Sequence, residues 1–262
     1  MDIKDTAVNA AKAAGLLLRE RLGNAGRIDY KGAVNIVTEM DTKAEDLIVA
    51  VIKKDFPEHA ILTEERPEIV TGSSRRWIID PLDGTTNYAH AFPFFCVSIG
   101  FEDSNDVKLG VVYNPMLDEL FIAEKGKGAY LNGKRVGVSR VGDLGKSLLA
   151  TGFPYDIRQS QETNLDHFAD FAVRAQAIRR AGSAALDLCY TACGRFDGFW
   201  EMKLRPWDVA AASLIVKEAG GVITDFNGAA FTIHGAECLA SNGLIHRTML
   251  DVLMKKAAGQ GV

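Results

Sequence analysis

The chain has 262 residues, of which 47% are hydrophobic and 24% charged, and its formal net charge at pH 7 is −4. A chain of this length and composition can bury a large apolar core and needs no disulfides to fold. The small negative charge argues against a dedicated nucleic-acid-binding protein, because such proteins carry a basic face that neutralises phosphates. Apolar runs of about 20 residues are absent and residues 1–12 lack a signal-peptide pattern, so we expect a cytoplasmic protein that does not enter a membrane.

Apolar periodicity and turn residues predict alternating helices and strands along the chain. In chain order, the first part is predicted to contain a helix (5–22), a glycine-containing loop with a short extended piece (31–41), a helix (42–56), two strands (60–63 and 77–80) and three antiparallel strands (95–101, 108–113 and 119–123). The second part is predicted to contain a strand (148–151), a helix (161–174), a strand (177–180), a helix (182–193), a strand (196–200), a helix (206–219), two strands (222–224 and 239–240) and a closing helix (244–256). This mixture favours layered sheets and helices over an all-helical or all-β protein.

The four cysteines are Cys96, Cys189, Cys193 and Cys238, and no CxxC pair occurs. Cys189 and Cys193 stand at i and i+4 in an apolar stretch and would share one helix face. Because no further thiol or imidazole stands at a metal-binding spacing, we predict buried free thiols and a reducing compartment.

Acidic residues follow predicted strands, at points where a polar side chain can leave the core and face a cleft. Glu64 and Glu65 follow one strand, and Asp80 ends the next. Pro81 disfavours a helical conformation at Asp80 and keeps the chain extended there, so the following turn can bring Asp83 back toward Asp80. Two carboxylates so close repel each other unless a cation lies between them, and Mg²⁺ prefers such oxygen ligands.

The segment after Asp83 is suited to phosphate. If residues 84–90 begin a short helix, the N–H groups of Gly84 and Thr85 point outward at its N-terminus, where anions bind. Asp208, in the first turn of a later predicted helix, is a further acidic residue at the edge of an element. Each of these residues alone can be a solvated turn or cap. Together they favour a cation site beside a phosphate site, as metal-assisted phosphoryl transfer requires.

Two longer motifs contain these residues: W-I-I-D-P-L-D-G-T-T-N-Y at 77–88 and P-W-D-V-A-A-A-S-L-I-V-K-E-A-G-G at 206–221. They resemble the two signatures of the inositol monophosphatase family, and Glu64-Glu65 stands at the expected distance before the first. The resemblance covers nearly the whole chain. It implies an α/β (mixed α+β) fold, a layered αβαβα sandwich of the type shared with fructose-1,6-bisphosphatase, and a homodimer. Residues 1–262 would form one catalytic domain, in which a subdivision near 140–147 would separate an N-terminal metal-binding half from a C-terminal substrate-binding half.

The resemblance also implies roles for the matching residues. One Mg²⁺ would be held by Glu64, Asp80 and the carbonyl of Leu82. A second would be held by Asp80, Asp83 and Asp208, and a third, weaker one would sit near Glu64 through water. Phosphate would be bound by Gly84 and Thr85. The catalytic residues beside the nucleophilic water would be Glu64, Thr85 and Asp41. Lys31 matches a family lysine, and Glu65 is a further candidate. Water attacks without a phosphoenzyme, and Li⁺ would replace the second Mg²⁺.

Substrate contacts are implied for Gly182, Ser183, Ala184, Glu201 and Asp208. Glu201 matches the family residue that binds ring hydroxyls of inositol, although it could also be a surface charge at a strand end. Ser183 can face the substrate, cap the following helix, or do both. Arg205 can reach the site or a neighbouring subunit, or stay on the surface.

The predicted activity is Mg²⁺-dependent hydrolysis of a small phosphomonoester, with inositol 1-phosphate as the first choice. Alternatives within the superfamily are phosphatases for fructose 1,6-bisphosphate, histidinol phosphate or adenosine bisphosphate, the last of which carries insertions that this chain lacks. A bisphosphatase needs added basic residues, and Arg179, Arg180 and Arg205 are candidates. A non-catalytic regulatory or binding protein on the same scaffold is the alternative of another class, and the complete set of ligand residues disfavours it.

Overall fold

The computed structural model describes residues 2–30 and 36–254. The helices are α1 (Ile3–Arg21), α2 (Glu39–Asp55), α3 (Thr85–Ala89), α4 (Leu165–Ala172), α5 (Ala184–Ala192), α6 (Pro206–Glu218) and α7 (His246–Met254), with a 3₁₀ turn at Leu144–Lys146. The strands are β1 (Ile28–Tyr30), β2 (Ile36–Thr38), β3 (Ala60–Thr63), β4 (Arg75–Asp83), β5 (Cys96–Asp103), β6 (Asp106–Asn114), β7 (Glu119–Glu124), β8 (Gly128–Leu131), β9 (Lys134–Arg135), β10 (Leu148–Thr151), β11 (Ala177–Arg179), β12 (Gly198–Met202), β13 (Val222–Thr224) and β14 (Glu237–Ser241).

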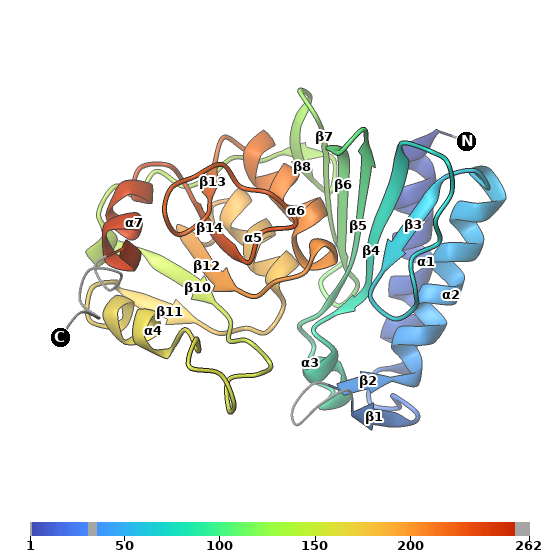
Figure 1. Ribbon diagram of the computed structural model, residues 1–262, viewed down its shortest axis with the longest axis horizontal. Coiled ribbons are helices and arrows are strands. Elements are labelled where there is room, and N and C mark those ends of the chain that lie inside the picture. Colours follow the sequence, from blue (N-terminus) through green and yellow to red (C-terminus); the bar gives the residue numbers. More distant parts are fainter. Residues whose placement is uncertain (1, 31–35, 255–262) are drawn as a thin grey trace.

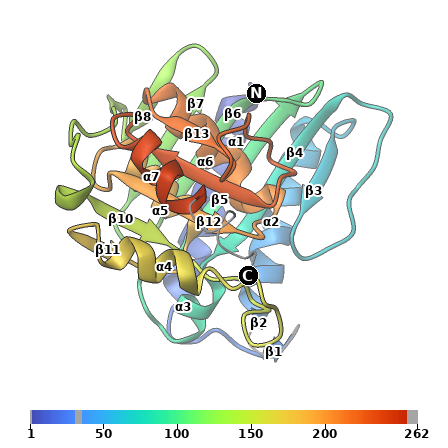
Figure 2. The ribbon, with the colours of Figure 1, turned by 60° about the vertical axis from the view of Figure 1, so that its left-hand side comes forward.

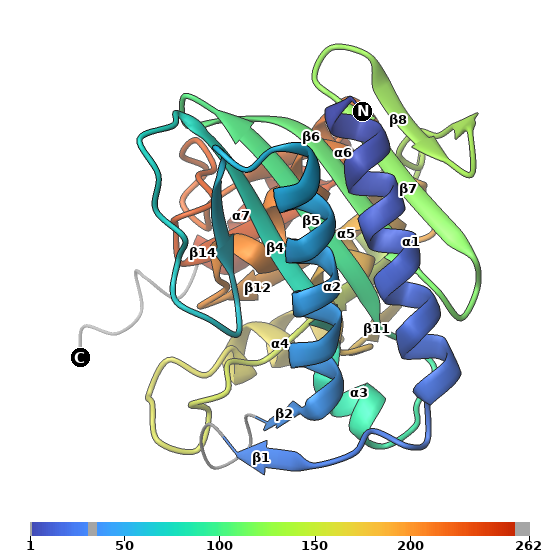
Figure 3. The ribbon, with the colours of Figure 1, turned by 90° about the vertical axis from the view of Figure 1, so that its right-hand side faces the viewer.

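Helix pairs and sheets alternate in an αβαβα sandwich (Figure 1). Helices α5 and α6 lie between a five-stranded and a seven-stranded sheet. Helices α4 and α7 cover the other face of the five-stranded sheet (Figure 2). Helices α1 and α2 lie across the outer face of the seven-stranded sheet (Figure 3). The expected layered α/β sandwich is therefore confirmed.

The two sheets are built from different parts of the chain. The seven-stranded sheet has the order β3-β4-β5-β6-β7-β8-β9, with β3 and β4 parallel and its other neighbours antiparallel. The five-stranded sheet has the order β11-β10-β12-β14-β13, with β10 parallel to β11 and β12. The segment 140–147, where we expected a subdivision, lies between the last strand of the first sheet and the first strand of the second.

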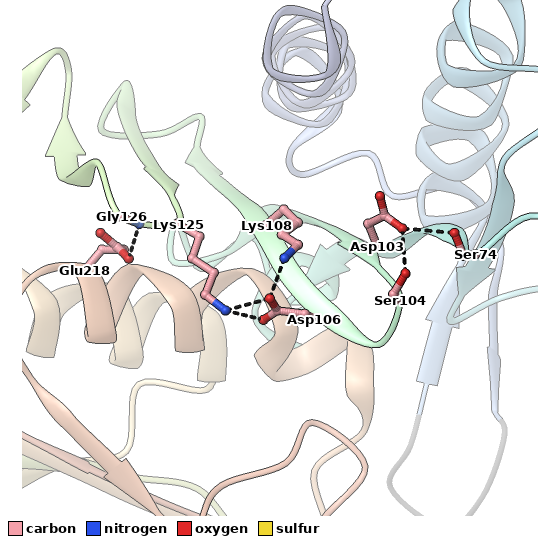
Figure 4. Close-up of polar contacts among 8 residues, drawn as sticks. All are labelled: Ser74, Asp103, Ser104, Asp106, Lys108, Lys125, Gly126 and Glu218. Carbon is pink, nitrogen blue, oxygen red and sulfur yellow. Dashed lines mark hydrogen bonds and ion pairs between the residues drawn. The ribbon is translucent and has the colours of Figure 1, made fainter.

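Helix α6 is fastened to the seven-stranded sheet at its C-terminal end. The carboxylate of Glu218 accepts hydrogen bonds from the backbone N–H groups of Gly126 at 2.7 Å and Gly128 at 2.8 Å, in and after the turn that joins β7 to β8. Figure 4 shows Glu218 reaching from the helix to Gly126. Because α6 also carries Asp208, this contact helps to set where that carboxylate stands.

Several predicted boundaries were wrong, two of them in ways that matter for the site. The strand expected at 77–80 continues to Asp83, with a bulge opposite β5 between Asp80 and Asp83. Pro81 is tolerated there because a bulge leaves ladder positions unpaired. The loop expected at 31–41 ends earlier, because Thr38 caps α2 and places Asp41 in its first turn.

Other differences concern the ends of elements. The helix expected at 161–174 begins only at Leu165, after Asn164 in a left-handed conformation. Strands β1, β8 and β9 were not predicted.

The four cysteines are free thiols, with Cys193 half-buried and the others buried, as predicted. In the described part of the chain, no helix combines the length and the apolar character that a membrane crossing needs.

Candidate active site

A cavity of about 510 Å³ opens where the ends of β4 and β12 meet the first turns of α3, α5 and α6. The predicted site residues that line it are Glu64, Asp80, Leu82, Asp83, Gly84, Thr85, Gly182, Ser183, Ala184, Glu201, Arg205 and Asp208. Asp41 and Glu65 do not line it, and Lys31 lies outside the described residues. The N-terminus of a helix carries a partial positive charge, so the convergence of α5 and α6 favours anions in this cavity.

Asp80 is a deeply buried acidic residue of the cavity. It is 2% exposed, and its Oδ1 accepts a hydrogen bond from the N–H of Leu82 at 3.0 Å. Burial raises the pKa of Asp80 well above its usual range. Repulsion adds to this effect and comes, in decreasing order, from Glu64, Asp83 and Asp208. Four carboxyl groups, two of them on β4, are thus close enough to disfavour one another's charge.

Asp83 is held by the first turn of α5. Its Oδ2 accepts hydrogen bonds from the hydroxyl of Ser183 at 2.6 Å and from the N–H of Ala185 at 2.8 Å. The Ser183 hydroxyl also caps α5 by accepting from the N–H of Leu186 at 3.4 Å. Burial raises the pKa of Asp83, and these hydrogen bonds oppose that rise. Ser183 is therefore a helix cap that also orients Asp83, while its substrate contact stays a prediction.

Asp208 reaches the cavity from the first turn of α6. Its Oδ2 accepts a hydrogen bond from the N–H of Arg205 at 2.6 Å, so the carboxylate is held at the helix N-terminus. Burial raises the pKa of Asp208 well above its usual range, and repulsion from Asp83 and Glu64 adds to the rise. Arg205 has an exposed side chain at the cavity wall, and its contact with substrate or with a second subunit stays a prediction.

Thr85 links the cavity to the buried Asp41. The Thr85 hydroxyl lies 2.9 Å from Asp41 Oδ1 and 3.1 Å from the carbonyl oxygen of Leu82, so its one proton has two acceptors. Asp41 Oδ2 accepts from the N–H of Thr38 at 2.8 Å and from its hydroxyl at 2.6 Å. Burial raises the pKa of Asp41. Because Asp41 is 1% exposed and does not line the cavity, it can act there only through Thr85.

The turn at Gly84 needs a glycine for two reasons. Its φ of +104° lies in the left-handed region, and an added Cβ would stand 3.0 Å from the carbonyl oxygen of Phe94. Asn87, which sequence reasoning missed, holds this turn to the loop before α5. Its Nδ2 donates to the carbonyls of Phe94 at 2.7 Å and Ala181 at 2.8 Å. The partners of Asn87 come from distant segments, so no local pattern could reveal its role.

Glu45, on α2, is a second residue that sequence reasoning missed. Its buried carboxylate accepts hydrogen bonds from the Thr63 hydroxyl at 2.5 Å and the N–H of Glu65 at 3.0 Å, and it pairs with Arg66. These partners stand on both sides of Glu64 in the chain. Glu45 therefore fixes the backbone that carries Glu64, and it also gives Glu65 a structural part outside the cavity.

Glu201 is a half-buried residue of β12 that lines the cavity, so its alternative interpretation as a surface charge was wrong. Gly152 makes room for it, since an added Cβ there would stand 2.1 Å from Glu201 Oε1. Burial raises the pKa of Glu201 to about 8; repulsion from Asp83 adds to the rise and Arg180 opposes it.

Comparison with known proteins identifies the family. The sequence profile of the inositol monophosphatase family matches residues 2–260. The chain belongs to the inositol monophosphatase family. It is 43% identical to an inositol-1-monophosphatase of Synechocystis over 251 residues, 95% of this chain and 88% of that protein. It is 42% identical to the Nus factor SuhB of Escherichia coli over 247 residues, 93% of this chain and 92% of that protein. An IMPase (inositol monophosphatase) of Thermotoga maritima, 38% identical, has the same fold with a TM-score of 0.90 and 100% coverage of both chains.

Members of this family are typically Mg²⁺-dependent, and the cavity offers suitable donors: carboxylates and the Leu82 carbonyl. Among the described residues, no Lys or Arg forms an ion pair with Asp80, Asp83 or Asp208, so a cation would relieve their repulsion. As the side chains stand, the described chain has no group of three His, Cys, Asp or Glu arranged to hold a metal ion. Asp83 and Asp208 each use Oδ2 in hydrogen bonds, so binding would use their other oxygens or turn the side chains.

Substituting Glu45→Gln is expected to lower kcat/KM for phosphate release by about 10-fold or more, as with other groups that orient metal ligands. The amide cannot accept all three hydrogen bonds with the strength of a carboxylate, so the segment around Glu64 loosens. Phosphate-release kinetics would measure the loss. Asp46→Asn is the matched control, because Asp46 pairs with the same Arg66 at 2.5 Å from an exposed position. Equal kinetics for both variants would show that Glu64 does not depend on Glu45.

Proposed function

We propose that the protein hydrolyses a small phosphomonoester with Mg²⁺, and that inositol 1-phosphate is its leading substrate. The observation that carries this proposal is a group of four of the acidic residues that line the cavity, beside the N-terminus of α3: Glu64, Asp80, Asp83 and Asp208. Carboxylates supply ligands for hard cations, and a helix N-terminus supplies donors for phosphate oxygens. Family membership supports the same reaction class.

The predicted site residues of the cavity would have separate roles in binding or catalysis. Glu64, Asp80 and the Leu82 carbonyl would hold one cation; Asp80, Asp83 and Asp208 would hold another, with a third near Glu64. Bound Mg²⁺ would supply charge neutralisation and make water more acidic. The N–H groups of Gly84 and Thr85 would hold phosphate oxygens. Positioning and charge neutralisation dominate catalysis of phosphoryl transfer, so a rigid arrangement of these residues is what the reaction needs.

Thr85 and Asp41 would receive the proton of the attacking water. The Thr85 hydroxyl donates to Asp41 Oδ1 at 2.9 Å, which leaves its lone pairs available to a water in the cavity. Because burial raises the pKa of Asp41, its carboxyl group can take the proton that Thr85 passes on. Glu64 would orient the same water from the cavity wall.

A substrate panel tests this function. Phosphate release would be measured with Mg²⁺ and with EDTA on inositol 1-phosphate, fructose 1,6-bisphosphate, histidinol phosphate and adenosine 3′,5′-bisphosphate. We expect Mg²⁺-dependent release with the highest kcat/KM on inositol 1-phosphate. Preference for another compound would change the substrate and keep the reaction class. If Mg²⁺ promoted release from none of them, the proposed function would be wrong.

A binding role without catalysis is the second candidate, and the 42% identity to the Nus factor SuhB favours it. The two candidates make different demands on the cavity. Hydrolysis needs the acidic residues, whereas a binding role on the protein surface does not. Catalysis is the better supported function, because a chain used only for binding has no need to keep four mutually repelling carboxyl groups in one cavity.

A further inference from the structure

Asp187, on α5, has no part in the mechanism proposed above. Every residue of this helix is buried, and Asp187 itself is 1% exposed, yet Asp187 is one of the residues that line the cavity. Among the described residues, no hydrogen-bond partner reaches its Oδ1. The hydroxyl of Thr191 donates to the backbone carbonyl of Asp187 at 2.9 Å and leaves the carboxyl group alone. The helix therefore makes no use of this side chain.

The packing around Asp187 gives no reason for an acidic residue. A buried carboxyl group without a partner is unfavourable, and an apolar side chain of similar size would suit α5 better. Burial raises the pKa of Asp187 well above its usual range; repulsion from Glu201 and Asp83 adds to the rise, and Arg180 opposes it. In the described chain, Arg180 forms no ion pair with any carboxylate that could compensate for this burial. Such a costly group is expected where a ligand can satisfy it.

Seven of the charged groups that line the cavity fall into two overlapping sets. Glu64, Asp80 and Asp208 affect one another and belong to the end proposed for cations and phosphate. The groups that affect Asp187 are Glu201, Asp83 and Arg180. Asp83 belongs to both sets and Glu201 also affects Asp208, so the second set adjoins the phosphate end. With phosphate at Gly84 and Thr85, the second set faces the alcohol part of a phosphomonoester.

We propose that Asp187 is a specificity-determining residue that accepts a hydrogen bond from a hydroxyl group on the alcohol part of the substrate, next to Glu201. This inference rests on the proposed phosphatase function. In either protonation state, Asp187 has a carboxyl oxygen that can accept a hydrogen bond. The hydroxyl groups of a neutral polyol are donors for such a bond. A second phosphate group would instead lie beside the carboxyl groups of Asp187 and Glu201, with only the guanidinium of Arg180 in this set to balance its charge. The substrate class is therefore a polyhydroxylated monophosphate rather than a bisphosphate.

The experiment compares two substrates that share the phosphate chemistry. Inositol 1-phosphate carries hydroxyl groups, whereas p-nitrophenyl phosphate carries none. We expect Asp187→Ala to lower kcat/KM for inositol 1-phosphate by about 10- to 100-fold, the loss expected for a hydrogen bond to a charged or strongly polar group. Mg²⁺-dependent hydrolysis of p-nitrophenyl phosphate should stay near the wild-type value. Asp187→Asn keeps an acceptor oxygen and the side-chain shape, so it should retain part of the preference for inositol 1-phosphate over p-nitrophenyl phosphate. It replaces the alanine variant in this comparison if that variant does not fold.

The possible results separate this inference from the function on which it rests. Asp106→Ala, at the first residue of β6 with a half-exposed side chain, is the control and should leave the hydrolysis of both substrates unchanged. If Asp187 variants lost activity equally on both substrates, or on neither, the specificity role would be wrong while the phosphatase function stood. If the wild type hydrolysed neither substrate with Mg²⁺, the proposed function would fail, and this inference with it.

Discussion

Asp80→Asn is expected to lower kcat/KM for Mg²⁺-dependent phosphate release by more than about 100-fold, because losing a group that only supports a metal ligand already costs about 10- to 100-fold. The asparagine Oδ1 can still accept the hydrogen bond from the N–H of Leu82, so the bulge of β4 should keep its shape. The substitution removes one charge from a set of groups that repel one another. The variant in EDTA should therefore melt no lower than the wild type.

The melting temperature in the presence of Mg²⁺ supplies a readout other than turnover. Mg²⁺ should raise the Tm of the wild type, because a ligand that binds only the folded state stabilises it, and should not raise that of Asp80→Asn. Asp106→Asn is the matched control: Asp106 pairs with Lys108 and Lys125 at the surface (Figure 4) and should keep both turnover and the Mg²⁺ response. If Asp80→Asn kept wild-type turnover or the full rise in Tm, Asp80 would not be a metal ligand.

Some segments with clear end signals were predicted nearly to the residue. The strand at 60–63 coincides with β3, and the helix at 206–219 differs from α6 by one residue. Pro206 at the start and Gly220-Gly221 after the end explain that agreement. β9, with two residues, is too short to show a period, and β1, with three, is little better. The five-layer arrangement followed from the family resemblance, because the order of elements alone indicates layers without saying which helices lie between the sheets.

The predicted residues that line the cavity were easiest to find where they lie close together in the chain. Asp80, Asp83 and Gly84 lie within five residues, and the effect of Pro81 on the backbone can be argued from the chain itself. Asn87, Glu45 and Asp187 were missed for a common reason. Each is an unremarkable polar residue in its local pattern. Asn87 and Glu45 act through partners from distant segments, and Asp187 is distinguished by its burial beside the cavity. Sequence periodicity cannot show that an acidic side chain on a helix faces inward, toward a loop or a cavity.

Gly110→Ala is expected to destabilise the protein by about 3 kcal/mol and to lower its Tm by roughly 6–12 °C, the cost of forcing extra atoms into a packed interior. A Cβ at Gly110, on β6, would stand 2.2 Å from the carbonyl oxygen of Ala211 on α6. The obstacle is backbone, so no side-chain rotation can relieve the clash. Gly100, which pairs with Gly110 on the neighbouring strand, would bring a Cβ to 3.1 Å from Ala210. Two adjacent glycines thus let α6 approach the sheet.

The same substitution should reach the active site, because α6 is held at both ends. Glu218 fixes its C-terminal end to the β7–β8 turn, and Asp208 lies at its N-terminal end in the cavity. A helix pushed from the sheet at Ala211 must therefore strain the Glu218 contact or displace Asp208. We expect kcat/KM to fall even at temperatures where the variant stays folded. Gly72→Ala is the matched control, since a Cβ there meets nothing within 4 Å, and its Tm and kinetics should match the wild type. If Gly110→Ala had the Tm and kinetics of this control, α6 would not pack closely on β6 at Gly110.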